Sequence, residues 1–298
     1  MSWNKGIVTR FHSNMATVND LKTNTSLECV LRGKFKVQKI RPIVGDYIEY
    51  SKDDNNPIGK IENILERKNI LYRPSIANLD QVILVTTLKY PEVDFLIVDK
   101  FIVQAEKEDL DIIIVLNKID LLTDEDQKLK EKFLNIYSNL YTVIETSTKQ
   151  NLNVEIIREK MKNKVSTLAG MSGVGKSSIL NMINPGLKLR IGNISDKLKR
   201  GKHTTTHSEL LRFDFGGFVA DTPGFANIET YNIEKENLKD YFYEFYQYSR
   251  YCQFVDCQHV NEPNCGVKAA VRQEEISQSR YDNYLSIYSE IEKKVKKW

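Results

Sequence analysis

The spacing of apolar residues predicts a small β-barrel at the start of the chain. Residues 5–66 contain five short apolar segments separated by polar turns, at 5–14, 15–20, 26–33, 44–50 and 57–66. Five short strands in about 60 residues favour a barrel, and the five-stranded OB-fold is the commonest candidate, with other small barrels as the alternative. Residues 68–78, which include Arg73-Pro74, form a predicted linker.

From Asp80 onward, apolar runs alternate with polar segments of helical periodicity. The predicted strands lie at 81–88, 111–118, 142–147, 164–170 and 217–224, and the predicted helices at 98–108, 125–140, 154–163 and 175–184. This alternation is typical of parallel strands buried under helices, so it predicts an α/β domain. After Gly224, aromatic and charged residues dominate, and 277–298 reads as a charged helix. The predicted domains are therefore 1–68, 69–229 and a mainly helical 230–298.

Composition narrows the class of protein. The 298 residues are 41% hydrophobic and 28% charged, as in soluble globular proteins. The sequence has no apolar run of about 18 residues and no apolar signal core near residue 1, so we expect a cytoplasmic protein without a membrane partner. The net charge of +3 is too small to indicate nucleic-acid binding alone, although residues 1–70 carry twelve basic against eight acidic side chains. We expect a monomer.

The segment GMSGVGKS at 170–177 fits the phosphate-binding pattern GxxxxGKS. It follows a predicted strand and opens a predicted helix, which is the context that the motif requires. Backbone N–H groups of such a loop bind phosphate oxygens, Lys176 reaches the outer phosphates, and the Ser177 hydroxyl joins the Mg²⁺ ligands. A glycine-rich turn without nucleotide is the alternative. The predicted nucleotide-binding residues here are Gly170, Ser172, Gly173, Val174, Gly175, Lys176, Ser177 and Ser178.

A second motif, NKID at 117–120, predicts guanine as the base. The carboxylate of Asp120 can accept from both N1–H and the exocyclic amine of guanine, and adenine lacks this donor pair. Asn117 and Lys118 shape the base pocket. Ser147, in the STK segment after the next strand, is the fourth expected base-side residue.

Two further segments suit the magnesium and switch positions of a GTPase. DTPG at 221–224 matches DxxG, in which Asp221 holds Mg²⁺ through water and the Gly224 N–H senses the γ-phosphate, although a Pro-Gly turn is the alternative. GKHTTTHS at 201–208 supplies a threonine cluster, and either Thr205 or Thr206 is expected to complete the Mg²⁺ ligands.

The order of these motifs along the chain is circularly permuted. In other GTPases the phosphate loop comes first and the base motifs come last, whereas here the base motifs come first.

Three of the four cysteines cluster near the C-terminus. Cys252, Cys257, His259 and Cys265 have the spacing CxxxxCxHxxxxxC, which predicts a closed tetrahedral zinc site with a structural role. Scattered buried cysteines are the alternative, because the spacing is not a common finger pattern. Cys29 lies on an apolar strand and is expected in a core.

Four aromatic residues near the C-terminus have helical spacing and are expected in a core as well. They are Tyr241, Phe242, Phe245 and Tyr248.

The chain resembles the ribosome small-subunit-dependent GTPase A family in three features. They are the barrel, the Cys/His tail, and the order of the motifs NKID, STK, GMSGVGKSS, GKHTTT and DTPG. LYRP at 71–74 and ANLDQ at 77–81 are similar to the family's linker. The resemblance spans essentially the whole chain. It implies an OB-fold, a permuted GTPase domain and a zinc domain, and it implies an rRNA-binding factor of late small-subunit (30S) maturation whose GTP hydrolysis the subunit stimulates.

The residues leave the hydrolytic step open. Many GTPases carry a water-orienting glutamine after DxxG, but this chain has Phe225, which cannot hydrogen-bond water. We expect His203 to position the water, with His207 as second choice and a solvent-exposed loop histidine as the alternative. Gly173 stands where potassium-dependent relatives commonly have Asn, so no potassium requirement is predicted.

Basic residues in and near the barrel could follow an RNA backbone, or they could form a solvated face. They are Arg32, Lys34, Lys36, Lys39 and Arg41. Two other functions stay open at this stage: an RNA-binding module in which nucleotide only fixes shape, and a permuted GTPase that serves the large subunit or a transfer RNA.

Overall fold

The computed structural model describes residues 3–33, 35, 40–53, 56–72, 75–187, 209–221 and 233–295. The chain falls into two compact units. One draws on residues 1–82, 154–168 and 177–226, and the other on 83–153, 169–176 and 227–298. Each unit therefore joins segments that are far apart in sequence. Within the described ranges, no helix has the length and apolar character needed to cross a membrane.

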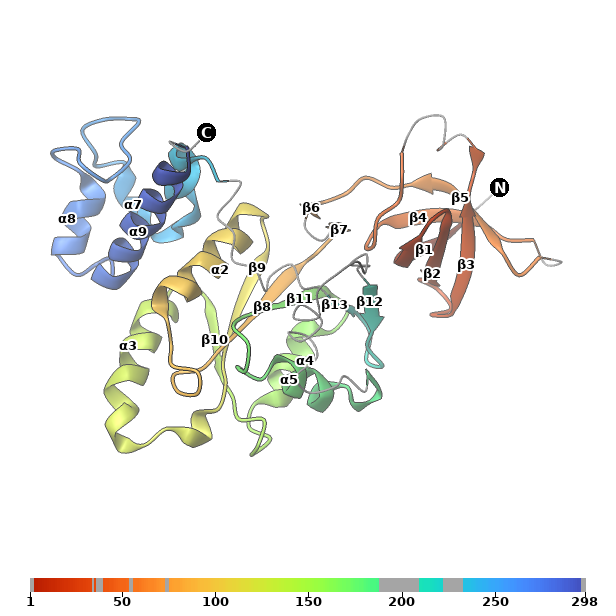
Figure 1. Cartoon of the computed structure of the whole chain (residues 1–298), viewed down its shortest axis with the longest axis horizontal. Coiled ribbons are helices and arrows are strands. Elements are labelled where there is room, and N and C mark those ends of the chain that lie inside the picture. Colours follow the sequence, from red (N-terminus) through yellow and green to blue (C-terminus); the bar gives the residue numbers. More distant parts are fainter. Residues whose placement is uncertain are drawn as a thin grey trace. The chain divides into compact units, whose positions relative to one another are not determined.

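The first five strands close into a barrel (Figure 1). They are β1 (Asn4–His12), β2 (Met15–Asp20), β3 (Ser26–Leu31), β4 (Tyr47–Ser51) and β5 (Gly59–Ile64). Their order is β1-β2-β3-β5-β4, and β3 and β5 pair in parallel while the other pairs are antiparallel. The interior includes Val8, Val18, Ile48 and Ile61, and Cys29 is fully buried among them. The predicted five-stranded, OB-like barrel is confirmed, and Cys29 is a core residue.

The predicted linker contains a short hairpin that is fastened to the barrel. Its strands are β6 (Ile70–Tyr72) and β7 (Ser75–Ala77), and Ile76 bridges to Val44 beside the barrel. Just before the hairpin, Arg67 donates from Nε to Asp46 Oδ1 at 2.6 Å and from Nη2 to Asp46 Oδ2 at 2.8 Å. A bidentate pair with a buried carboxylate fixes orientation as well as distance. This part of the linker is therefore ordered.

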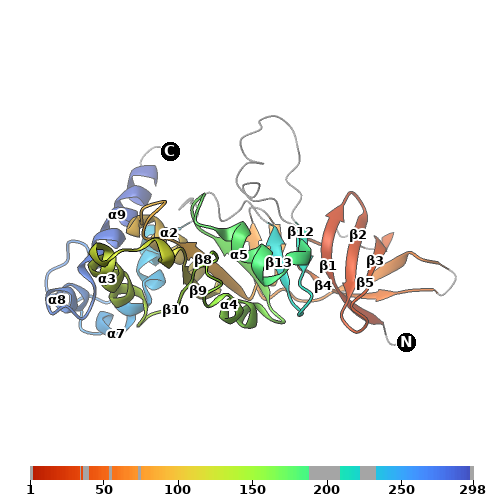
Figure 2. The same cartoon turned by 90° about the horizontal axis from the view of Figure 1, so that it is seen from below.

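A six-stranded sheet forms the centre of the α/β region (Figures 1 and 2). Its strands are β8 (Gln81–Thr86), β9 (Asp111–Leu116), β10 (Thr142–Glu145), β11 (Val165–Ala169), β12 (Glu209–Arg212) and β13 (Phe218–Asp221), in the order β10-β9-β8-β11-β13-β12. β8 and β11 are buried at every residue, as expected for central strands. The edge strand β12 runs antiparallel to β13 and was not among the predicted strands.

In the described part of the chain, four α-helices connect these strands, as the polar segments predict. They are α2 (Phe95–Lys107), α3 (Gln127–Tyr137), α4 (Val154–Met161) and α5 (Lys176–Ile183). α2 begins earlier than predicted because the Asp94 carboxylate accepts from the backbone N–H groups of Leu96 and Ile97 and so caps the helix. The α/β class is confirmed.

The C-terminal region is mainly helical, as predicted. It contains the 3-10 helices η4 (Lys235–Tyr241) and η5 (Tyr243–Phe245) and the α-helices α7 (Tyr246–Ser249), α8 (Gly266–Arg272) and α9 (Gln278–Val295). Phe242 and Phe245 are fully buried, and Tyr241 and Tyr248 pack against the same core. The aromatic residues with helical spacing therefore form a core, as expected.

Candidate functional site: a nucleotide loop, a base loop and a Cys/His cluster

The loop between β11 and α5 has the backbone shape of a phosphate-binding loop. Gly170, Gly173 and Gly175 all adopt positive φ, at 128°, 84° and 104°. A Cβ atom on Gly170 would lie 2.0 Å from the Val85 carbonyl oxygen, so a side chain is excluded there. Glycine at these positions lets the chain turn tightly and expose backbone N–H groups. Ser172 and the buried Val174 lie in this loop, and Ser177 and Ser178 follow Lys176 into the first turn of α5.

Lys176 folds back across its own loop. Its Nζ donates to the carbonyl oxygens of Gly170 and Met171, both at 2.7 Å. Burial lowers the pKa of this ammonium to about 8, because the charged form loses hydration. A phosphate group would return the lost stabilisation, so the lysine is poised to exchange carbonyl partners for an anion.

The base motif is bonded to the phosphate loop within one compact unit. Asn117, which is 2% exposed, donates from Nδ2 to the Val174 carbonyl at 2.8 Å. The Lys118 Nζ donates to the carbonyl oxygens of Gly173 and Tyr90, each at 2.6 Å. These hydrogen bonds fix the position of the segment that would recognise the base relative to the loop that would hold the phosphates. The contact between Lys118 and Tyr90 carried no signal in the sequence.

The carboxylate that we expect to recognise guanine is positioned by a serine. Asp120 lies in the 3-10 helix η1 (Ile119–Leu121), and its Oδ1 accepts from Ser147 Oγ at 2.6 Å. The same Ser147 Oγ accepts from the Gln150 backbone N–H at 3.1 Å, so the base-side loop fixes the hydroxyl. The structure therefore brings Asn117, Lys118, Asp120 and Ser147 to one place, as the two motifs predict for a base pocket.

The predicted switch residues fall outside the described part of the chain. Asp221 is the last residue of β13, paired with Glu209, so its backbone lies at the carboxyl end of a sheet strand. This end of a strand is where ligands bind in open α/β sheets. His203, Thr205, Thr206, His207, Gly224 and Phe225 lie outside the described residues.

The three cysteines and the histidine near the C-terminus form one compact cluster. Their ligand atoms all lie within 4.8 Å of one another. Cys252 Sγ and Cys265 Sγ are 3.8 Å apart, and His259 Nδ1 lies 3.5 Å from the first and 3.3 Å from the second. Tetrahedral zinc, with bonds of about 2.3 Å to sulfur and about 2.0 Å to nitrogen, requires about 3.8 and 3.5 Å for these separations. The cluster fits a tetrahedral metal ion.

Burial also shifts the pKa values of residues in this cluster. In the absence of a cation, burial raises the pKa of the Cys257 thiol to about 12 and lowers the pKa of His259 to about 4. Both shifts favour the neutral form of the group, because a lone buried charge is costly. A divalent cation would supply the charge that thiolates need, so metal binding and thiol deprotonation would occur together.

Comparison with known proteins identifies the family. Residues 64–231 match the RsgA GTPase family and residues 5–61 match the RsgA N-terminal domain. Relatives named "Small ribosomal subunit biogenesis GTPase RsgA" from Thermotoga petrophila and Thermotoga maritima are each 53% identical over 287 residues, which is 96% of either chain.

Two solved structures share the fold. YjeQ from Thermotoga maritima superposes with a TM-score of 0.88 at 50% identity, over 97% of this chain and 98% of that one. YloQ, described as a circularly permuted GTPase, gives 0.84 at 35% identity, over 98% and 96%. These matches confirm the resemblance and the permuted order of the motifs. The chain belongs to the RsgA GTPase family.

Proposed function

We propose that this GTPase acts in late maturation of the small (30S) ribosomal subunit, that it binds rRNA there, and that the subunit stimulates its GTP hydrolysis. Relatives that match nearly the whole chain carry the name of small ribosomal subunit biogenesis GTPases. The structural observation that carries the proposal is that the base motif is hydrogen-bonded to the phosphate loop. Asn117 donates to the Val174 carbonyl, and Lys118 donates to the Gly173 carbonyl. This arrangement suits a nucleotide that is recognised at its base and its phosphates together.

GTP, GDP and Mg²⁺ are the proposed ligands of this site. The phosphates would lie on the loop that contains Gly170, Ser172, Gly173, Val174, Gly175, Lys176, Ser177 and Ser178. Mg²⁺ would be held by Ser177, by Asp221 through water, and by Thr205 or Thr206. The ion would stabilise the negative charge that develops on the transferred phosphoryl group.

The hydrolytic step requires a group that Phe225 cannot supply. We propose that His203 positions the attacking water and that Gly224 responds to the γ-phosphate. Because His203 stands beside the switch threonines, a partner that positions this segment around GTP would raise the rate. A slow intrinsic turnover with strong stimulation is the expected kinetic pattern.

The Cys/His cluster is proposed to hold one structural zinc ion. Its donor set of three sulfurs and one imidazole suits zinc in a site with four protein ligands and no open position. The ligands would be Cys252, Cys257, His259 and Cys265. Such an ion would fasten the loop before α8 to the helical core.

The barrel is the proposed RNA-binding part. Of the five basic residues expected to follow an RNA backbone, Arg32 is paired with Glu62 at 2.7 Å, and Arg41 is exposed. Lys34, Lys36 and Lys39 lie outside the described residues. We extend the proposal to a cytoplasmic monomer without a membrane partner, with domains at 1–68, 69–229 and 230–298.

GTP turnover tests the proposed function directly. Purified protein would be assayed alone, with small ribosomal subunits, and with large subunits as the control. Stimulation by small subunits alone supports the proposal. Equal slow turnover in all three contradicts it and favours a binding module, and stimulation by large subunits points to the other type of permuted GTPase. His203→Ala should then lower the stimulated rate without weakening GTP binding.

A further inference from the structure

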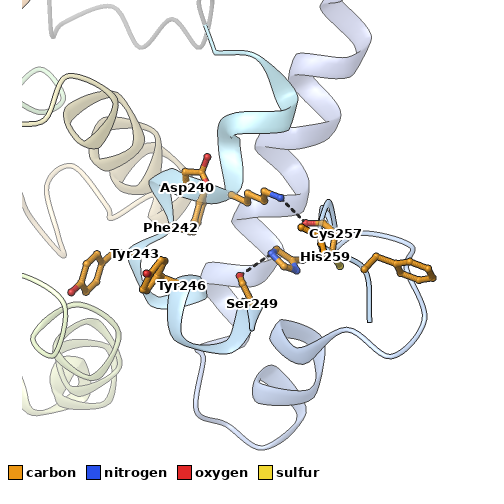
Figure 3. Close-up of a pocket in the computed structure, with 10 residues that line it drawn as sticks. Asp240, Phe242, Tyr243, Tyr246, Ser249, Cys257 and His259 are labelled. Carbon is orange, nitrogen blue, oxygen red and sulfur yellow. Dashed lines mark hydrogen bonds between the residues drawn. The ribbon is translucent and has the colours of Figure 1, made fainter. Parts of the chain in front are cut away.

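The two ring nitrogens of His259 face different surroundings. Nδ1 faces the sulfurs of Cys252 and Cys265 at 3.5 and 3.3 Å. Nε2 lies on the other side of the ring, 3.3 Å from the Ser249 Oγ atom at the end of α7. Figure 3 shows Ser249 and His259 joined in this way, beside Cys257. Only Nδ1 is therefore placed to be the fourth metal ligand.

The Ser249 hydroxyl has a fixed direction. It donates its hydrogen to the Phe245 carbonyl oxygen at 2.9 Å. A hydroxyl group carries one hydrogen, so toward His259 it can act only as an acceptor. Nε2 must then carry the imidazole proton, and Nδ1 must present its lone pair to the cluster. This is the tautomer that ligation through Nδ1 requires.

The rest of the ring is held by packing. His259 is 1% exposed, and its ring meets the Phe245 ring edge to face, with centroids 5.8 Å apart at 88°. Its backbone carbonyl accepts from the Tyr281 hydroxyl at 2.7 Å. These contacts fix the position of the ring, but they are indifferent to which nitrogen is protonated. The choice of tautomer falls to Ser249.

A cavity of about 600 Å³ adjoins this hydrogen bond. Ser249, His259 and Cys257 form part of its wall, together with the exposed rings of Tyr243 and Tyr246. If the hydroxyl were removed, water in this cavity could reach Nε2. A water molecule can donate or accept, so it would satisfy the nitrogen without selecting one tautomer.

We propose that Ser249 is a positioning residue for the metal site: oriented by the Phe245 carbonyl, it holds His259 in the Nε2–H tautomer with Nδ1 as the fourth ligand. The proposal rests on the metal ion proposed for this cluster. Partners of this kind, when removed, typically weaken metal binding by about 10- to 100-fold.

Matched substitutions at residue 249 separate the hydroxyl from the packing. Threonine and valine have nearly equal volume and differ by the hydroxyl group. Ser249→Thr should keep zinc affinity near that of the unchanged chain. Ser249→Ala admits water and should weaken affinity moderately, and Ser249→Val, which fills the space with methyl groups, should weaken it by about 10- to 100-fold.

The control is an exposed serine with the same kind of backbone contact. Ser286 in α9 donates to the Asp282 carbonyl, four residues before it, at 2.9 Å, as Ser249 does to Phe245. Ser286→Ala should leave zinc affinity unchanged. Zinc affinity of the full chain would be measured by competition with a chromophoric chelator, and long-range ¹H–¹⁵N spectra would report which nitrogen of His259 is protonated.

The outcomes distinguish the two proposals. If the unchanged chain binds no stoichiometric zinc, the metal proposal fails, and the role of Ser249 fails with it. If it binds zinc and folded Ser249→Val binds zinc equally well, the metal proposal stands and the role of Ser249 is overturned. Weaker binding in Ser249→Val with rescue in Ser249→Thr supports both. Equal weakening in the threonine and valine variants would assign the effect to packing and overturn the role of the hydroxyl.

Discussion

Arg280 and Asp99 are 181 residues apart in the chain, yet Arg280 Nη1 lies 2.7 Å from Asp99 Oδ1. Both side chains are almost completely buried. The other nitrogens of the guanidinium, Nε and Nη2, donate to the two carboxylate oxygens of Glu244 at 2.6 and 3.0 Å. Asp99 also accepts from Tyr137 and Asn283. The ion pair joins α2 of the α/β region to α9 of the C-terminal region, within one compact unit.

Removal of the arginine should be strongly destabilising. Arg280→Met leaves the carboxylates of Asp99 and Glu244 buried without their cation, and breaking a buried pair in this way costs about 3–5 kcal/mol. Urea unfolding would measure the loss. Arg272→Met, at an exposed position in α8 of the same region, should change stability by less than about 0.5 kcal/mol. Equal small effects from both variants would show that the buried pair adds no stability.

A single substitution at Asp120 should change which base the protein prefers. Asp120→Asn replaces an acceptor of the guanine N1–H and amine by an amide, which can donate to the C2 oxygen of xanthine. GTP affinity should fall by about 1.5–3 kcal/mol, which is roughly 10- to 150-fold, and XTP affinity should rise. Competition binding with fluorescent GDP would measure both. Ser147→Ala removes the bond to Asp120 and the acceptor of the Gln150 N–H but leaves the carboxylate in place, so it should keep the preference for guanine. Unchanged selectivity in Asp120→Asn would exclude this carboxylate from base recognition.

Nucleotide affinity should depend on pH above about 8. Burial lowers the pKa of Lys176 to about 8, and bound phosphates should raise it, because they favour the ammonium form. Above about pH 8 the free protein therefore carries fewer protons than the complex, so binding takes up a proton and affinity falls by up to about tenfold per pH unit. Below about pH 7 this effect is absent.

Calorimetric titration with GDP and Mg²⁺ at pH 8.5, in two buffers of different ionisation enthalpy, would reveal the proton uptake. Lys176→Arg is the control, since a guanidinium stays charged over this range. Proton uptake that persists unchanged in Lys176→Arg would assign it to another group.

Loss of the metal should loosen the C-terminal helices. We expect one zinc ion per chain in freshly purified protein, and chelation should speed amide hydrogen exchange in α8 and α9, because metal binding and folding are coupled in such sites. Cys257→Ser should lower the zinc content. Cys29→Ser, at the buried cysteine of the barrel, should leave it at one ion per chain. Substoichiometric zinc at neutral pH without chelator would refute the assignment.

Local sequence patterns predict much of this architecture. The barrel, the α/β region and the helical tail follow from periodicity, and the glycines and Lys176 follow from the phosphate-loop motif. The short edge strand β12 was missed, because four residues at a sheet edge give little periodic signal. The start of α2 was missed as well, because the capping by Asp94 outweighs the apolar pattern.

Local sequence patterns could not predict which side chains from distant segments contact each other. Asp99 lies in an apolar helix, and Arg280 lies in a charged one; nothing local to either residue indicates that they meet. Likewise, the spacing of the four Cys/His residues predicts a metal site, but the role of each nitrogen of His259 depends on Ser249, which no metal motif includes. These contacts depend on how the helices pack, and that is decided by the whole core.

Gly175 has a consequence for how this site can change during evolution. A Cβ atom there would lie 2.3 Å from the Asn117 Nδ2 atom, and the backbone φ of 104° already disfavours a side chain. Any replacement of Gly175 would push away the asparagine of the base motif, which stands 58 positions earlier in the chain. The two motifs can be rearranged along the gene, as the permutation shows, but they cannot diverge independently. Selection must act on the pair as one inherited unit.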